Sequence, residues 1–164
     1  MTVIDVVIES EEWDTHPGLD ALIETSIRAA LAGAAVTTLP GAEIAVLLTD
    51  DEGIAALNGR WRGKPAPTNV LSWPAVAPAL LSLSPMIGDI ALAYETVARE
   101  AAAEGKTFAD HVAHLAVHGA LHLAGHDHEI PADAEIMEGL ERRILAGLGI
   151  ADPYASPETG EFLT

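Results

Sequence analysis

Histidines in the segment 118–128 recur at a spacing that suits a metal ion. They occupy its first, fifth and eleventh positions, and Gly125 lies between the second and the third. Residues four apart lie one above the other on a helix, so His118 and His122 can bind one ion. A glycine can adopt the left-handed conformation that ends a helix, and Gly125 would return His128 to this pair. Three imidazoles leave a coordination position open, which is typical of catalytic rather than structural zinc.

The helix predicted to carry the first two ligands has an apolar background. Between residues 108 and 124 nearly every position other than histidine is apolar, which predicts a central helix buried on all sides. His114, one turn before His118, either orients a ligand or lines the cleft, and we expect His111 to be partly exposed. Asp127 either accepts a hydrogen bond from a ligand's second ring nitrogen or is solvated in the turn.

The same spacing occurs in zinc proteases, but one residue argues against that class. The three histidines and the glycine match the protease pattern H-E-x-x-H-x-x-G-x-x-H. The protease glutamate acts as the general base, and Gly119 stands at its position here. Peptide hydrolysis is therefore disfavoured, whereas metal-activated water acting on another bond remains open.

The charge of the chain is strongly acidic, with one local exception. The formal net charge is −17, from 25 acidic and 8 basic residues, which disfavours general affinity for nucleic acid. Arg60, Arg62 and Lys64 fall within five positions, and no acidic residue lies between Gly53 and Ile87. We therefore expect a cationic loop on an acidic body, with arginines suited to bidentate phosphate contacts.

Hydrophobic patterning predicts one domain over residues 1–150. Apolar and β-branched residues predict strands near 3–9, 42–49, 69–73 and 86–93, the second of them buried on both faces. Helices are expected near 17–34, 94–104, 108–124 and 131–148, with a short helix after Asp50, a loop at 75–85 and a flexible tail at 151–164. Because strands and helices alternate only partly, the pattern indicates an α+β domain or a mixed-sheet α/β domain.

Composition also bears on the compartment. The chain has no cysteine, no apolar run as long as a membrane span and no signal peptide at its start. Absence of cysteine is compatible with the cytosol. We therefore expect no membrane association.

Several segments together resemble the YbeY family of bacterial metal-dependent endoribonucleases. They are Leu57 with Asn58, WRGK at 61–64, PTNVLSWP at 67–74, GDI at 88–90 and HGALHLAGHDH at 118–128. Trp61 and Trp73 replace the smaller aromatic residues usual in that family. The order and separation of the segments agree from the second expected strand to the last helix.

The resemblance implies a fold, a cofactor and a substrate. The implied fold is a single α+β domain with a mixed sheet of about four strands flanked by helices. Zn²⁺, one ion per chain, would bind His118, His122 and His128, and Arg62 would be important for RNA cleavage. The implied role is maturation of the 3′ end of 16S ribosomal RNA and ribosome quality control in the cytoplasm, with RNA and the small ribosomal subunit or its associated proteins as partners.

Three functions are compatible with these residues. The first is a single-strand-specific endoribonuclease in which Arg62, supported by Lys64, stabilises charge on the scissile phosphate. The second is a ribosome-associated RNA- or protein-binding maturation factor with a mainly structural zinc. The third is a metal-dependent hydrolase of another ester or amide. Nickel or another divalent ion would also suit three imidazoles.

Overall fold

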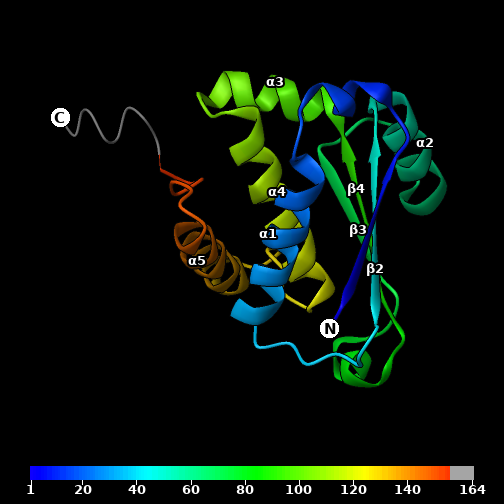
Figure 1. Ribbon diagram of the computed structural model, residues 1–164, viewed down its shortest axis with the longest axis vertical. Helices are drawn as coiled ribbons and strands as arrows, with labels where there is room; N and C mark the ends of the chain where they lie inside the picture. The colour runs from blue at the N-terminus through cyan, green and yellow to red at the C-terminus, as the bar shows by residue number, and fades with distance from the viewer. Residues whose placement is uncertain (156–164) are drawn as a thin grey trace.

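Four strands form a mixed sheet in the computed structural model, which describes residues 1–155 (Figure 1). The strands are β1 (Val3–Ile8), β2 (Glu43–Thr49), β3 (Val70–Pro74) and β4 (Met86–Ala93), in the spatial order β1-β2-β4-β3. β1, β2 and β4 are parallel, and β3 is antiparallel to β4. The α+β fold with a four-stranded mixed sheet is therefore confirmed.

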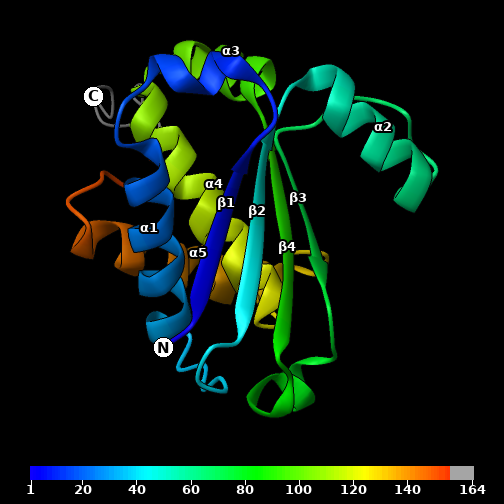
Figure 2. The ribbon, with the colours of Figure 1, turned by 45° about the vertical axis from the view of Figure 1, so that its right-hand side comes forward.

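The helices are distributed unequally over the two faces of this sheet. α1 (Leu19–Gly33), α4 (Phe108–Leu123) and α5 (Pro131–Gly147) lie on one face, and α3 (Tyr94–Glu104) follows β4 (Figures 1 and 2). α2 (Asp51–Arg62) lies on the other side. Most of α4 is buried, because it contacts α1, α3, α5 and the sheet. The expected central, buried, histidine-bearing helix is confirmed.

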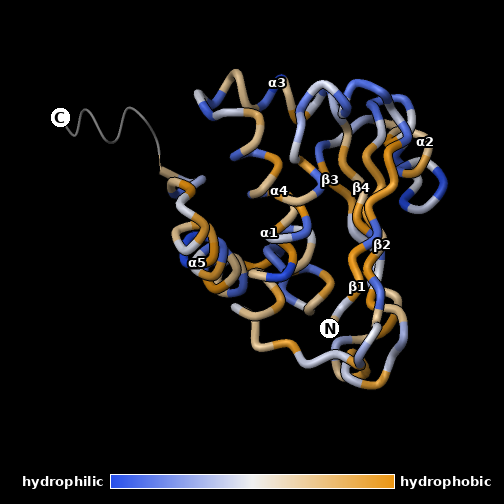
Figure 3. Tube along the Cα trace, in the orientation of Figure 1, coloured by the Kyte–Doolittle hydropathy of each residue, from blue (hydrophilic) through white to orange (hydrophobic). Residues whose placement is uncertain are grey.

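Burial along β2 differs from the expectation that both faces are covered. Hydrophobic residues run along the strands (Figure 3), but Ile44, Val46 and Leu48 are buried while Ala45 and Leu47 are only half-buried. The prediction was wrong because α2 covers only part of the second face of the sheet, and a groove lined by Ala45 and Leu47 remains beside it.

Two segments without predicted structure form short 3-10 helices. Residues Glu11–Thr15 carry Trp13, which is buried and donates its indole N–H to the carbonyl of Thr49 at 2.7 Å. Pro78–Leu83 lies within the expected loop and buries Leu81. Trp13 is a single large apolar residue in a polar stretch and has no periodicity, so sequence patterning did not indicate its contact.

The first part of the expected tail contacts the helices. The Arg142 guanidinium pairs with Asp152, and Lys106 donates from Nζ to the carbonyl of Pro153 at 3.1 Å. Tyr154 donates its hydroxyl to Glu141. The remainder of the predicted flexible tail, 156–164, lies outside the described residues, and the boundary at residue 150 stays a prediction. Within residues 1–155, no helix is both long and apolar enough to cross a membrane.

Candidate active site

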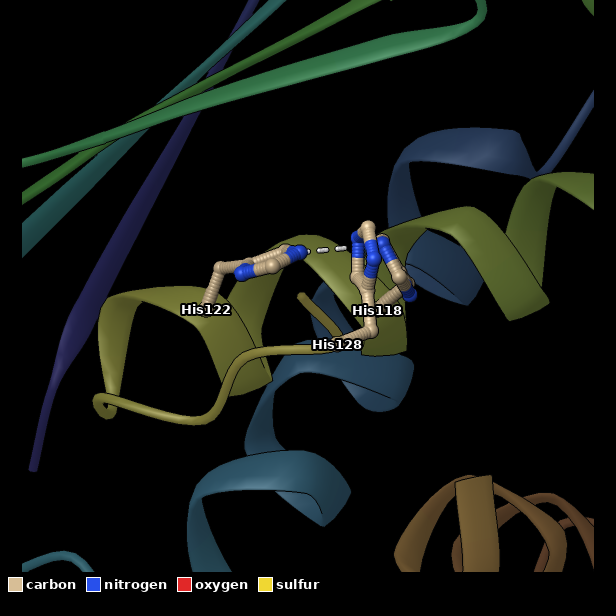
Figure 4. Close-up of side chains that lie close together, drawn as sticks. All are labelled: His118, His122 and His128. Atoms are coloured by element: carbon tan, nitrogen blue, oxygen red, sulfur yellow. Dashed lines mark hydrogen bonds between the residues drawn. The ribbon is translucent and has the colours of Figure 1, made fainter. Parts of the chain in front are cut away.

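The three predicted metal ligands converge on one point. His118 and His122 come from α4 and His128 from the loop beyond it (Figure 4), and one ring nitrogen of each lies within 4.8 Å of the others. The Nε2 atoms of His118 and His122 are 3.1 Å apart. Two nitrogens on a tetrahedral zinc with bonds of about 2.0–2.1 Å are separated by about 3.3 Å. The donor set and its spacing fit a single zinc ion.

Gly125 makes this convergence possible, as the sequence predicted. Its φ is +102°, in the region that glycine adopts without strain. The N–H of His126 returns to the carbonyl of Leu121 at 3.0 Å, which closes the end of α4. A Cβ at Gly125 would also lie 2.7 Å from Cγ of Pro78. Both the backbone conformation and the available space therefore require glycine here.

A buried carboxylate that sequence reasoning missed orients the first ligand. Glu141 of α5 is 0% exposed and accepts from Nδ1 of His118 at 2.7 Å and from Nε2 of His114 at 2.9 Å. When Nδ1 of His118 donates to this carboxylate, its Nε2 lone pair is directed to the metal position, the arrangement of a carboxylate–histidine–zinc triad. Burial acts to raise the pKa of Glu141, but the hydrogen bonds from His114 and His118 outweigh it and hold that pKa at about 2.

One sequence signal could have identified Glu141. It lies four residues after Met137 and four before Leu145, both fully buried, so a charged residue occupies the apolar stripe of α5. Buried charges are paired or bind metals, and this position therefore required a partner. That partner was not readable from sequence, because it lies 23 residues away on another helix.

Two further side chains complete the surroundings of Glu141. Tyr154 donates to the same carboxylate oxygen as His114, and burial together with this carboxylate raises the pKa of the Tyr154 hydroxyl. His114 therefore contacts Glu141, the hydrogen-bond partner of His118, and does not line the cleft that holds the three predicted ligands.

His111 is 3% exposed and bonds to Glu100 at 2.9 Å, so the expectation of partial exposure was wrong.

Asp127 and His122 have different surroundings. Asp127 is exposed and accepts from the backbone N–H of His128 at 2.7 Å, and among residues 1–155 it makes no hydrogen bond to a histidine ring. The pKa of His122 is lowered to about 4, mainly because its ring is buried and also because His118 and His128 lie beside it. The His122 ring is therefore neutral near pH 7, as a metal ligand must be.

A cleft of about 670 Å³ joins the histidines to the end of α2. The expected cationic loop is partly helical, because Arg60 and Arg62 form the last turn of α2 and only Lys64 follows it. Arg62, Ser72 and Pro74 line one side, and the three histidines with Asp127 line the other. Arg62 closes α2, where Gly63 adopts a φ of +69°, and its Nη2 donates to the carbonyl of Ser72 at 3.1 Å. Lys64 is exposed and does not line the cleft. The fold thus brings Arg62, but not Lys64, into the cavity of the metal site.

Comparison with known proteins agrees with the motifs. The family model described as endoribonuclease YbeY matches residues 7–149. The chain is 52% identical to the endoribonuclease YbeY of Nitrobacter winogradskyi over 160 residues, covering 95% of this chain and 84% of the relative. It is 49% identical to that of Methylocella silvestris over 155 residues, covering 94% and 87%.

A solved structure supports the fold. The solution structure of a Thermotoga maritima protein superposes with a TM-score of 0.54 at 21% identity and covers 93% of this chain and 99% of that protein. At this identity the likeness concerns the fold alone. The family match and the close relatives confirm the resemblance, and the chain belongs to the YbeY family of endoribonucleases.

Proposed function

We propose that this protein is a zinc-dependent endoribonuclease that cleaves single-stranded RNA in the cleft between Arg62 and the histidines. His118, His122 and His128 would hold one Zn²⁺ ion. The observation that carries the proposal is that Arg62 and the three histidines line a single cavity although they are far apart in sequence. An open metal site facing a fixed guanidinium suits attack on a phosphodiester.

The chain's own residues have separate parts in this reaction. When bound, the zinc ion would supply Lewis-acid activation of water and of a phosphoryl oxygen. Arg62 would bind the scissile phosphate through two N–H donors, and its bond to the Ser72 carbonyl would hold the guanidinium at the cleft. Glu141 keeps the Nδ1 proton on His118. Asp127 lines the cavity and would accept a proton from the attacking water, and exposed Lys64 would attract the RNA backbone beside it.

Membership of the family supports a more specific substrate. We propose the 3′ end of 16S ribosomal RNA as the target, within ribosome quality control, with the small ribosomal subunit or its associated proteins as partners. This role would place the activity in the bacterial cytoplasm. The acidic remainder of the molecule suits recognition by basic surfaces rather than by RNA at large.

Metal analysis combined with RNA cleavage tests the proposal. His118→Ala should lose both zinc and cleavage, whereas Arg62→Ala should keep zinc and lose cleavage. Arg143→Ala, which removes an exposed cation of α5 outside the cleft lining, is the control and should cleave normally. Equal cleavage by highly purified parent, His118→Ala and Arg62→Ala proteins would refute the proposal and favour a binding factor.

A further inference from the structure

A chain of hydrogen bonds joins the two sides of the cleft at the end nearest α3. Asn69, which precedes β3 and lines the cleft, donates from Nδ2 to Oε1 of Glu100 on α3 at 2.9 Å. The same oxygen accepts from Nε2 of His111 on α4 at 2.9 Å. One carboxylate therefore connects the beginning of β3 to the helix that carries two of the three predicted metal ligands.

The amide of Asn69 is held in one orientation. Its Oδ1 accepts from the backbone N–H of Val70 at 2.6 Å, and its backbone carbonyl accepts from the N–H of Ala93 at 3.1 Å. Because Val70 offers a donor and Glu100 an acceptor, only one arrangement of the amide satisfies both. β3 is antiparallel to β4, and α3 follows β4 directly, so the beginning of β3 lies beside α3 (Figure 2). Glu100 thus fixes the residue from which β3 starts.

The burial of His111 is explained by this contact better than by packing. The residue is buried on a helix whose neighbouring positions are apolar, and a buried polar group without a partner is costly. Its Nδ1 is buried and has no hydrogen-bond partner within residues 1–155, so Glu100 is the polar partner of this ring there. An apolar side chain would fill the same space at lower cost. A histidine at this position is therefore useful for its bond to Glu100.

The link and the active site are spaced alike along both elements. His111 precedes His118 by seven residues, which is two turns and about 10.5 Å along one face of the helix. Asn69 precedes Ser72 by three residues, which is about 10 Å along a strand. β3 and α4 both run away from α3 (Figure 2), so the first metal ligand and the carbonyl that holds the guanidinium lie at similar distances from the link. The link therefore sets how far apart the two sides stand at the active site.

We propose that Glu100 is a positioning residue for RNA cleavage, because it sets the distance between the side that would bind the scissile phosphate and the side that would bind zinc. Glu100 does not line the cleft and acts through Asn69 and His111. This inference rests on the proposed function, since the distance matters only if Arg62 and the zinc ligands act on one phosphate. A displacement of about 1 Å between reacting groups lowers a rate by about a hundredfold, so the link contributes to kcat rather than to affinity.

Three substitutions at position 100 separate distance from charge. Glu100→Ala removes the link and should lower kcat about tenfold to a hundredfold on a labelled single-stranded RNA, with the KM and zinc content of the parent. Glu100→Gln keeps the side-chain length and one acceptor oxygen, so it should recover most of the rate. Glu100→Asp keeps the charge but is one methylene shorter, so it should not. Glu104→Ala, which removes an exposed carboxylate one turn later that pairs with Lys106, is the matched control.

Two further measurements test whether the link itself is responsible. Asn69→Ala and Glu100→Ala break the same link, so their losses in kcat should not add in the double variant. In protein without RNA, the amide hydrogens of Val70 and Ala93 should exchange about tenfold faster in Glu100→Ala than in the parent, as measured by NMR. Additive losses in kcat together with unchanged exchange would refute the link.

The outcomes distinguish this role from the proposed function. If Glu100→Ala cleaves with the kcat and KM of the parent while Arg62→Ala abolishes cleavage, the positioning role is refuted and the endoribonuclease proposal stands. If Glu100→Asp recovers the rate as well as Glu100→Gln does, charge rather than distance matters and the role is overturned. If the parent binds a second zinc ion that Glu100→Ala loses, the cluster of Glu100, Glu104 and His111 is a metal site instead. A purified parent that does not cleave RNA refutes both proposals.

Discussion

The two walls of the cleft between Arg62 and the histidines hold their functional side chains by different means. On the histidine wall, His118 projects from the buried helix α4 and bonds to Glu141, which is itself fully buried on α5. On the other wall, Arg62 is exposed at the end of α2, and within residues 1–155 its side chain makes one hydrogen bond, to the backbone carbonyl of Ser72.

This difference suits what each wall would bind under the proposed function. Metal ligands must present their lone pairs at fixed distances from one ion, and a packed helix with a buried hydrogen-bond network provides that precision. A phosphate on a flexible RNA chain would be bound by a permanently charged side chain that one hydrogen bond to the backbone holds at the cleft. Substitutions on the histidine wall should therefore change metal binding, and substitutions on the arginine wall should change catalysis alone.

The largest effect is expected from His118→Ala. Removing one of three ligands should abolish stoichiometric zinc and reduce cleavage to background, as measured by metal analysis and an RNA assay. Zinc at about one hundred times its Kd should stabilise the parent by about 2.7 kcal/mol, or about 5–10 °C in Tm. The variant should show no such shift, and a parent-like shift would remove His118 from the ligand set.

Arg62→Ala should give the next largest effect and the sharpest contrast. Loss of a group that stabilises transition-state charge typically costs about a hundredfold to a thousandfold in kcat. Zinc content and Tm should equal those of the parent, because within residues 1–155 the Arg62 side chain hydrogen-bonds to the Ser72 carbonyl and to no histidine. Arg62→Lys should recover only part of the activity, since lysine lacks the bidentate fork. Loss of zinc in Arg62→Ala would mean that the two walls are coupled.

Glu141→Gln should weaken metal binding while keeping all three ligands. Outer carboxylates that orient a metal-bound histidine typically contribute about tenfold to a hundredfold in affinity. Competition with a chromophoric chelator would measure the change, and circular dichroism would verify the fold. Glu138→Gln, one turn earlier on α5 and half-buried, is the control. If Glu141→Gln binds zinc as tightly as the parent and Glu138→Gln do, Glu141 does not orient His118.

The smallest effect is expected from Tyr154→Phe. The substitution removes one donor from the Glu141 carboxylate and should lower the free energy of unfolding by about 1 kcal/mol, as measured with urea. Tyr94→Phe, which removes the hydrogen bond between Tyr94 and His16 far from the metal site, provides a comparison. An unchanged urea midpoint for Tyr154→Phe would show that the contact of residue 154 adds no stability.

Sequence alone determined the features that depend on local geometry. The four-residue step from His118 to His122 lies within one helix, and the reversal at Gly125 depends on a single backbone angle, so both were predictable. Gly119 was also informative, because it stands where zinc proteases have their glutamate. The resemblance to the family then indicated that Arg62 belongs with these histidines.

Tertiary structure decided the features that join distant elements. Glu141 reaches His118, Tyr154 reaches Glu141, and Trp13 is buried against Thr49 only because helices and strands pack at particular positions. The burial of His111 and the half-open face of β2 depend on the placement of neighbouring helices in the same way. Local spacing fixes which side chains share a helix face, whereas hydrogen bonds between elements require the packing of those elements, which no single segment encodes.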